Sequence, residues 1–126
     1  MTKTVLCYGD SLTWGYSAET VGRHAYEDRW PSVLQKALGD RVRVIPEGLN
    51  GRTTAFDDHL ADCDRNGARI LPTILQSHNP LDLVIIMLGT NDMKPVRPLP
   101  PCRASAAWSS WCAIMPGGST TRCPIS

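Results

Sequence analysis

The feature that most constrains the fold is an uninterrupted apolar run, Leu-Val-Ile-Ile-Met-Leu, at residues 83–88. Its β-branched residues favour a strand, and its length is far below the roughly 18 residues that a membrane-spanning helix needs. A strand with one face in water alternates apolar and polar residues, so a run that is apolar at every position indicates a strand buried on both faces. Such strands are typical of parallel sheets covered by helices, and the run therefore predicts an α/β fold.

The rest of residues 1–96 alternates between strand and helix patterns. The strand-like segments are residues 5–8, 42–45 and 81–88, the last of which contains the apolar run. The segments with helical apolar spacing are residues 30–38 and 68–77. Pro46 is expected to close the second strand, whereas Pro72 lies inside the second helical pattern. Because β-α-β crossovers are right-handed, we predict a doubly wound parallel sheet with the spatial strand order second, first, third.

Each predicted strand leads into a polar segment that contains glycine. The three segments are residues 9–15, 48–54 and 89–92. Ligands of doubly wound sheets bind beyond the carboxyl ends of the strands, so we expect all three segments to meet at one rim.

Three residues of these segments suit acyl transfer. Ser11 follows a Gly-Asp turn, which places its hydroxyl at the start of a helix, and the N–H of Gly51 can approach a ligand closely. With the neutral amide of Asn91, these groups amount to a nucleophile and an oxyanion hole. Each residue alone also fits a structural role: an N-cap, a turn or an Asx-turn. Their occurrence at three strand ends favours the chemical interpretation.

Three motifs resemble the first three blocks of the SGNH (GDSL-type) hydrolases. Their full sequences are similar to those of the bacterial arylesterase and acyltransferase branch. They are Gly-Asp-Ser-Leu-Thr-Trp-Gly from residue 9, Glu-Gly-Leu-Asn-Gly-Arg-Thr-Thr from residue 47, and Pro-Leu-Asp-Leu-Val-Ile-Ile-Met-Leu-Gly-Thr-Asn-Asp-Met-Lys from residue 80. The resemblance covers about residues 3–96 and implies a flavodoxin-like three-layer α/β/α fold with a doubly wound parallel sheet. It also implies hydrolysis of small carboxylic esters through an acyl-serine, with acyl transfer as a second activity and neither metal nor organic cofactor.

The resemblance assigns roles to residues of this chain. It implies Ser11 as nucleophile, and the N–H groups of Ser11 and Gly51 with the side chain of Asn91 as oxyanion donors. It makes Trp14 a candidate for the acyl pocket, although packing beside the turn explains Trp14 equally well. A homo-oligomer is a candidate assembly by the same resemblance.

Four neighbouring residues have expected or open roles. Asp10 and Asp92 are expected to orient their loops by accepting backbone N–H bonds. Arg52 either meets substrate or pairs with Glu47 or Asp92, and Cys7 is expected in the core. Phosphate binding by residues 9–11 is a rival interpretation, but Asp10 opposes an anion and no P-loop Gly-Lys-Ser/Thr is present.

This sequence departs from the family pattern at the general base. SGNH hydrolases take it from a carboxy-terminal Asp-x-x-His block, and no Asp-x-x-His occurs in this sequence. The histidines are His24, His59 and His78, which we interpret as exposed loop or helix-end residues, with His24 the best stand-in. We therefore expect a truncated, catalytically impaired esterase with one open edge and face of its sheet. A non-catalytic α/β binding module or pseudoenzyme fragment is the alternative.

Residues 97–126 have a composition unlike the rest of the chain. They contain no acidic residue, although 12 precede them, and they hold five of the 10 prolines and three of the five cysteines. Neither a disordered tail nor a periodic folded segment has this composition. Synonymous codons for residues 103–126 can be chosen so that the neighbouring frame encodes an amphipathic, charged stretch. We interpret residues 97–126 as an out-of-frame or disordered tail after a frameshift near Val96, and residues 1–96 as the amino-terminal portion of one domain.

Composition argues against other classes of protein. The net charge of +1 in 126 residues provides no basic surface for nucleic acid, and no segment resembles a membrane span or a signal peptide. Five cysteines without a Cys-x-x-Cys pair argue against a disulfide framework or a zinc site. We expect a cytoplasmic protein whose partner is a small ester, not nucleic acid or membrane.

Overall fold

A computed structural model describes residues 1–93 and the backbone of residues 112–114, and its centre is a four-stranded sheet. The strands are β1 (Lys3–Gly9), β4 (Val42–Gly48), β5 (Leu83–Met87) and β6 (Cys112–Ile114), in the spatial order β4-β1-β5-β6. Strand β1 pairs in parallel with both β4 and β5. The predicted order of the first three strands is therefore confirmed, and it follows from two right-handed crossovers.

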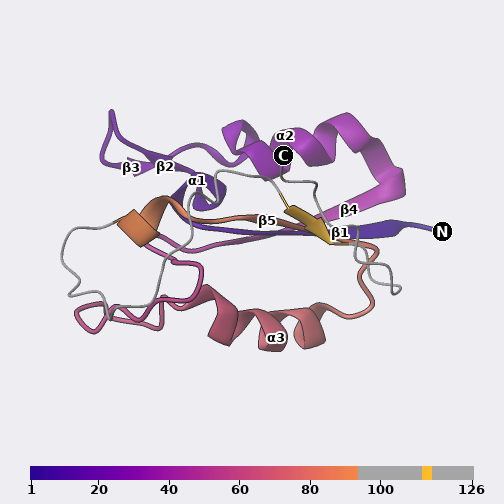
Figure 1. The fold of residues 1–126 in the computed structure, drawn as a ribbon. Helices are drawn as coiled ribbons and strands as arrows, with labels where there is room; N and C mark the ends of the chain where they lie inside the picture. Colours follow the sequence, from indigo (N-terminus) through magenta and orange to yellow (C-terminus); the bar gives the residue numbers. More distant parts are fainter. Residues whose placement is uncertain (94–111, 115–126) are drawn as a thin grey trace, which may run out of the picture.

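Two helices cover opposite faces of this sheet, as Figure 1 shows. Helix α2 (Trp30–Leu38) has proline in its first turn and ends at Gly39, and helix α3 (Gly67–His78) is capped by Asn66, whose side chain accepts from Arg69 N. Pro72 is accommodated inside α3. The three-layer α/β/α arrangement is thus as predicted. Helix α2 has the bounds of the pattern at residues 30–38, and α3 extends one residue beyond each end of the pattern at residues 68–77.

The core lies on the central strand. Leu6, Cys7 and Tyr8 are fully buried, and Val5 and Val84 nearly so. Because β1 lies between β4 and β5 with a helix on each face, every side chain from Val5 to Tyr8 is removed from water. The expectation that Cys7 belongs to the core is confirmed.

Short elements surround the sheet. They are α1 (Ser11–Trp14), the hairpin strands β2 (Tyr16–Ser17) and β3 (Gly22–Arg23), and the single turns η1 (Tyr26–Asp28), η2 (Gly39–Arg41) and η3 (Thr90–Met93). The β2–β3 hairpin was not expected from the sequence, since neither strand is long enough to show a period. In the part of the chain that the structure describes, no helix has the length and apolarity to cross a membrane.

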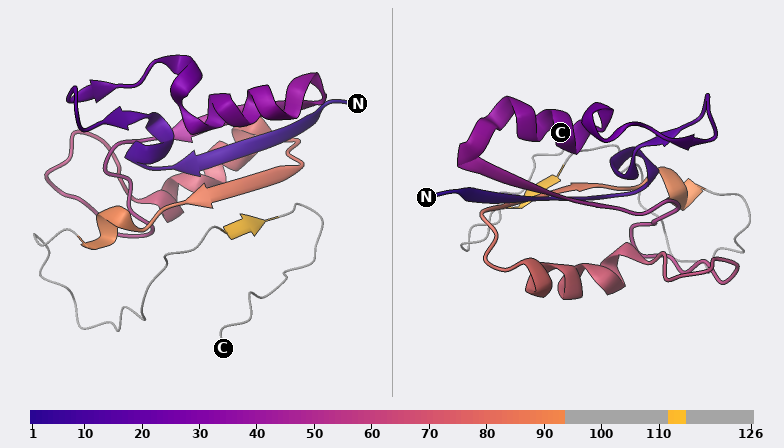
Figure 2. Two further views of the ribbon diagram at one scale, coloured as in Figure 1. Left: turned by 90° about the horizontal axis from the view of Figure 1, so that it is seen from above. Right: turned by 180° about the vertical axis from the view of Figure 1, so that it is seen from behind.

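Two sequence expectations need correction. Strand β4 does not stop at Pro46 but continues through it to Gly48, because β4 pairs only with β1 among the described strands and an edge strand tolerates a residue without an N–H. The edge beyond β5 is not open along Val84–Ile86, where β6 pairs antiparallel with β5 (Figure 2). Apart from β6, the proposed tail at residues 97–126 lies outside the described residues.

Candidate active site

The carboxyl ends of three strands bring the predicted loops together. Gly9, the last residue of β1, is in register with Gly48 of β4 and Met87 of β5. The loops after these strands therefore start at one level of the sheet, and Leu49 N donates to Gly9 O at 3.1 Å. This is the single rim that the sequence predicted.

Ser11 is the first residue of α1 and is partly exposed. Asp10 is the N-cap, and its Oδ1 accepts from Leu12 N at 3.0 Å, which holds the turn that presents Ser11. The short helix closes with Gly15 in the left-handed conformation, at φ 94°, where its N–H donates to Ser11 O. The loop-orienting role expected of Asp10 is thus observed.

Gly51 sits in a tight turn of the second loop, with φ 79°. A residue with a Cβ is strained in that conformation, so the turn favours glycine. Arg52 N donates to Leu49 O at 3.1 Å and closes the turn. The backbone at Gly51 is therefore held by both the conformation and the hydrogen bond.

Asn91 connects the third loop to the other two. Its Nδ2 donates to Arg52 O at 3.0 Å and lies 3.5 Å from Asp10 Oδ2. An amide has two N–H groups, and the longer contact is at the limit of a hydrogen bond. One N–H thus fixes the side chain on Arg52 O, and the other N–H is held only weakly, by Asp10 Oδ2.

Asp92 ties the same loop to the second one. Its Oδ1 accepts from Thr54 N at 2.9 Å and its Oδ2 from Thr54 Oγ1 at 2.7 Å. The expected orienting role of Asp92 is observed, although the partner lies in a different loop. Sequence reasoning did not identify Thr54, and its position next to the Gly-Arg-Thr turn was the only available signal.

Buried charges lie beneath the rim. Burial raises the pKa of Asp10, and the backbone N–H of Leu12 and the charge of Arg52 oppose that shift. Burial likewise lowers the pKa of Arg52, whose guanidinium stacks over the Tyr8 ring at 4.0 Å. The carboxylate and the guanidinium thus stabilise each other's charged forms at a distance, which lessens the cost of burying both.

Arg52 plays neither of the parts left open for it by the sequence. It is 4% exposed, and its Nη1 donates to Gly9 O at 3.0 Å and to Glu47 O at 2.6 Å. Its hydrogen-bond partners among the described residues are backbone carbonyls, not the carboxylates of Glu47 or Asp92. The spacing of the motif could not reveal this, because the contact depends on how β1 and β4 end side by side.

Trp14 has a partner of its own. The guanidinium of Arg23 lies 4.3 Å from the Trp14 ring centroid, and Arg23 Nε donates to Trp14 O at 2.8 Å. The β2–β3 hairpin therefore covers one side of Trp14. Its place in an acyl pocket stays a prediction.

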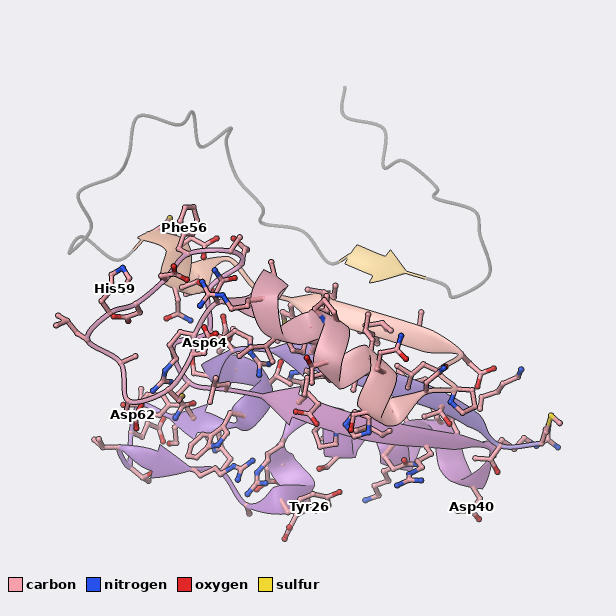
Figure 3. The ribbon with its side chains drawn as sticks, turned by 90° about the horizontal axis from the view of Figure 1, so that it is seen from below. Tyr26, Asp40, Phe56, His59, Asp62 and Asp64 are labelled. Atoms are coloured by element: carbon pink, nitrogen blue, oxygen red, sulfur yellow. The ribbon has the colours of Figure 1, made fainter. Side chains whose placement is uncertain are left out.

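The three histidines are placed differently. His24 is exposed, and its backbone N donates to Gly15 O, the residue that ends α1. His59 is exposed on the loop between β4 and α3, at the periphery of the molecule in Figure 3. His78 was expected to be exposed, but it is half-buried because its Nε2 lies 2.8 Å from Glu47 Oε1. Among the described residues, no three His, Cys, Asp or Glu side chains gather as a metal site would require.

Comparison with known proteins identifies the family. Residues 7–114 match the model of the GDSL-like Lipase/Acylhydrolase family. A search of curated protein sequences found no match. Several solved structures are similar to this chain.

A carbohydrate acetylesterase family member from Sinorhizobium meliloti is 77% identical, with a TM-score of 0.74 over 75% of this chain and 45% of that one. The native M. smegmatis aryl esterase is 52% identical, with a TM-score of 0.67 over 72% of this chain and 44% of that one. AlinE4, an SGNH-hydrolase family esterase, is 29% identical, with a TM-score of 0.56 over 73% of this chain and 42% of that one.

This chain thus spans a little under half the length of these structures. The family match extends over most of the chain and includes all three rim loops. On that basis, this chain belongs to the GDSL-like lipase/acylhydrolase family of SGNH hydrolases.

Proposed function

We propose that this chain carries the nucleophile and the oxyanion hole of a serine esterase for small carboxylic esters. The observation that carries the proposal is the contact of Asn91 Nδ2 with Arg52 O at 3.0 Å, which brings the amide beside the Gly51 turn. The same nitrogen lies 3.5 Å from the carboxylate of Asp10, the residue before Ser11. Both contacts support a site to which each of the three loops contributes one group.

The reaction would proceed in two steps. The Ser11 Oγ attacks the ester carbonyl carbon, a new C–O bond forms, and the N–H groups of Ser11, Gly51 and Asn91 stabilise the oxyanion. Collapse breaks the bond to the alcohol, which leaves with the proton that Ser11 lost. Water then attacks the acyl-serine carbonyl carbon, the bond to Ser11 Oγ breaks, and the proton lost by water returns to Ser11 as the acid leaves. An alcohol in place of water completes an acyl transfer in the same way.

The class of substrate follows from the surroundings of the site. Leu12 and Met93, which adjoin the proposed nucleophile and the third loop, are both exposed apolar side chains. Two of the similar structures are named an acetylesterase family member and an aryl esterase. We therefore infer that small acyl esters of aryl or alkyl alcohols are the substrates.

The proton acceptor is the weak point of the 126-residue chain. No Asp-x-x-His occurs in the sequence, and His78 is engaged with Glu47. A serine at its ordinary pKa is a poor nucleophile, and loss of triad members leaves only roughly 10³–10⁴-fold acceleration over water in other serine hydrolases. We infer that this chain is a catalytically impaired form. Of its histidines, His24 is the candidate stand-in, because its backbone N–H donates to Gly15 O at the end of α1, the helix that begins with Ser11.

The test compares two proteins with p-nitrophenyl acetate. The first is the 126-residue chain, for which we expect slow hydrolysis that Ser11→Ala lowers little. The second is the product of a coding region shifted by one base after Val96, for which we expect rapid hydrolysis that Ser11→Ala nearly abolishes. Ser77→Ala, an exposed position on α3, is the matched control and should leave the rate unchanged.

Two results would contradict parts of this proposal. Rapid, Ser11-dependent hydrolysis by the 126-residue chain would show that a base is present, and His24→Ala would then locate it. Hydrolysis by the frame-shifted product that survives Ser11→Ala would remove Ser11 as nucleophile. The absence of Asp-x-x-His also favours a second candidate, a non-catalytic α/β binding module, which an inactive frame-shifted product would support.

A further inference from the structure

Arg52 occupies an unusual position for a charged residue. Its side chain is buried under the rim, with its guanidinium over the Tyr8 ring. One nitrogen, Nη1, donates to both Gly9 O and Glu47 O, at 3.0 Å and 2.6 Å. The side chain thus joins the last residue of β1 to the second-last residue of β4, and these two strands lead to the first and second loops.

The backbone of Arg52 contacts the third loop as well. Its carbonyl oxygen accepts from Asn91 Nδ2 at 3.0 Å, and its N–H closes the turn that contains Gly51. One residue therefore contacts the end of the strand before Ser11, the turn of Gly51, and the side chain of Asn91. The side chain of Asn91, which contacts Arg52 O and Asp10 Oδ2, completes this connection from the third loop.

This arrangement carries a cost. Burial disfavours the charged guanidinium, and Arg52 Nε is buried without an acceptor among the described residues. An apolar side chain of similar volume could stack on Tyr8 without that cost. A buried, incompletely bonded cation directly beneath a proposed oxyanion hole is therefore better explained by a role at the site than by stability.

We propose that Arg52 is a positioning residue, whose guanidinium clamps the ends of β1 and β4 so that the Gly51 N–H and the Asn91 amide keep the spacing of an oxyanion hole. The inference rests on the proposed function. Arg52 is too buried to touch substrate and acts through its two neighbours. A displacement of about 1 Å at such donors can cost roughly 10²-fold in rate, so a clamp of this kind matters to kcat more than to KM.

The test uses the 126-residue chain and three variants. Arg52→Met keeps the apolar stack on Tyr8 but removes the donors to both carbonyls, whereas Arg52→Lys keeps a charged donor without the planar fork. Arg43→Met, at an exposed position of β4, is the matched control for loss of an arginine. Each protein is assayed with p-nitrophenyl acetate, and ¹⁵N–¹H spectra record the Gly51 backbone amide and the Asn91 side-chain amide.

We expect Arg52→Met to lower kcat about 10²-fold with KM within about threefold, and Arg52→Lys to recover about tenfold of that loss. The Gly51 and Asn91 resonances should move in Arg52→Met and stay in place in Arg43→Met, while the resonances of β1 remain. If Arg52→Met does not fold, the Arg52→Lys variant decides, with a kcat about tenfold below the parent and shifted resonances expected.

The proposal would be overturned if Arg52→Met folds and keeps the parental kcat and unshifted Gly51 and Asn91 resonances. If Arg52→Met does not fold, the same result for Arg52→Lys would overturn it. A parent chain without any hydrolysis above buffer would count against the proposed function instead. In that case the resonances alone decide on Arg52, because they report donor positions whether or not the ester is turned over.

Discussion

The carboxylate of Asp92 accepts two hydrogen bonds from Thr54, one from the backbone N–H at 2.9 Å and one from the hydroxyl at 2.7 Å. The two residues are 38 positions apart and belong to the third and second rim loops. This pair therefore fixes the loop of Asn91 relative to the loop of Gly51 independently of Arg52. It also makes the stability of the rim accessible to measurement.

Substitution of Thr54 and substitution of Asp92 should both destabilise the protein, but by different amounts. Thr54→Val loses one hydrogen bond and should lower the free energy of unfolding by about 1 kcal/mol, whereas Asp92→Ala also orphans the Thr54 N–H and should cost about 3 kcal/mol. Urea unfolding of both single variants and the double variant measures the coupling, which we expect near 1 kcal/mol. Strictly additive effects would show that the two residues do not interact in solution.

Gly48 should not tolerate a side chain. A Cβ at this position would lie 2.2 Å from Trp14 N and 2.6 Å from Trp14 Cα, which are backbone atoms of the helix that carries Ser11. We expect Gly48→Ala to lower the free energy of unfolding by about 3 kcal/mol, because α1 must move away from β4. Gly22→Ala is the control, since its nearest neighbour would be 3.4 Å away and ordinary contact results. Equal urea midpoints for the two variants would contradict the close approach of α1 and β4.

The buried carboxyl of Asp10 should make stability depend on pH. Burial raises its pKa above the ordinary value of 3.8, so the native state binds more protons than the unfolded state in the pH range just above that value. The advantage of the wild type over Asp10→Asn should therefore shrink as the pH rises through this range. Urea unfolding of both proteins from about pH 3 to about pH 7 measures the difference.

Asp82 provides the opposite case for comparison. The hydrogen bonds from Lys3 and from the N–H of Thr4 lower its pKa. Its contribution is present above 3.8 and is lost as the pH falls through the lowered value, so the advantage of the wild type over Asp82→Asn should grow with rising pH. If the advantage of the wild type over Asp10→Asn also grew with rising pH, Asp10 would not be desolvated in the native state.

Cys7 and Cys63 should differ sharply in reactivity. Cys7 is fully buried, and burial raises the pKa of its thiol to about 12, whereas Cys63 is exposed. Since the thiolate is the nucleophile, iodoacetamide at about pH 8 should label Cys63 quickly and Cys7 only after unfolding. Peptide mass mapping of samples labelled with and without urea tests this. Labelling of native Cys7 at the rate of Cys63 would contradict its place in the core.

Local patterns in the sequence determined the elements of the fold. The bare apolar runs around Leu6 and Val84 specified strands buried on both faces, and the handedness of crossovers then fixed their order. The polar motifs at strand ends likewise identified Ser11, Gly51 and Asn91, because parallel strands deliver such loops to one rim. These inferences depend only on neighbouring residues and on general rules of chain geometry.

Tertiary structure decided what each side chain does at the rim. Arg52 bonds to the carbonyls of Gly9 and Glu47, and His78 lies beside Glu47, because strands and helices distant in sequence end close together. Pro46 remains inside β4 because the sheet order places that strand at an edge among the described strands. A long flexible side chain has many partners within reach of its motif, and burial, hydrogen-bond geometry and desolvation select one only after the layers have packed.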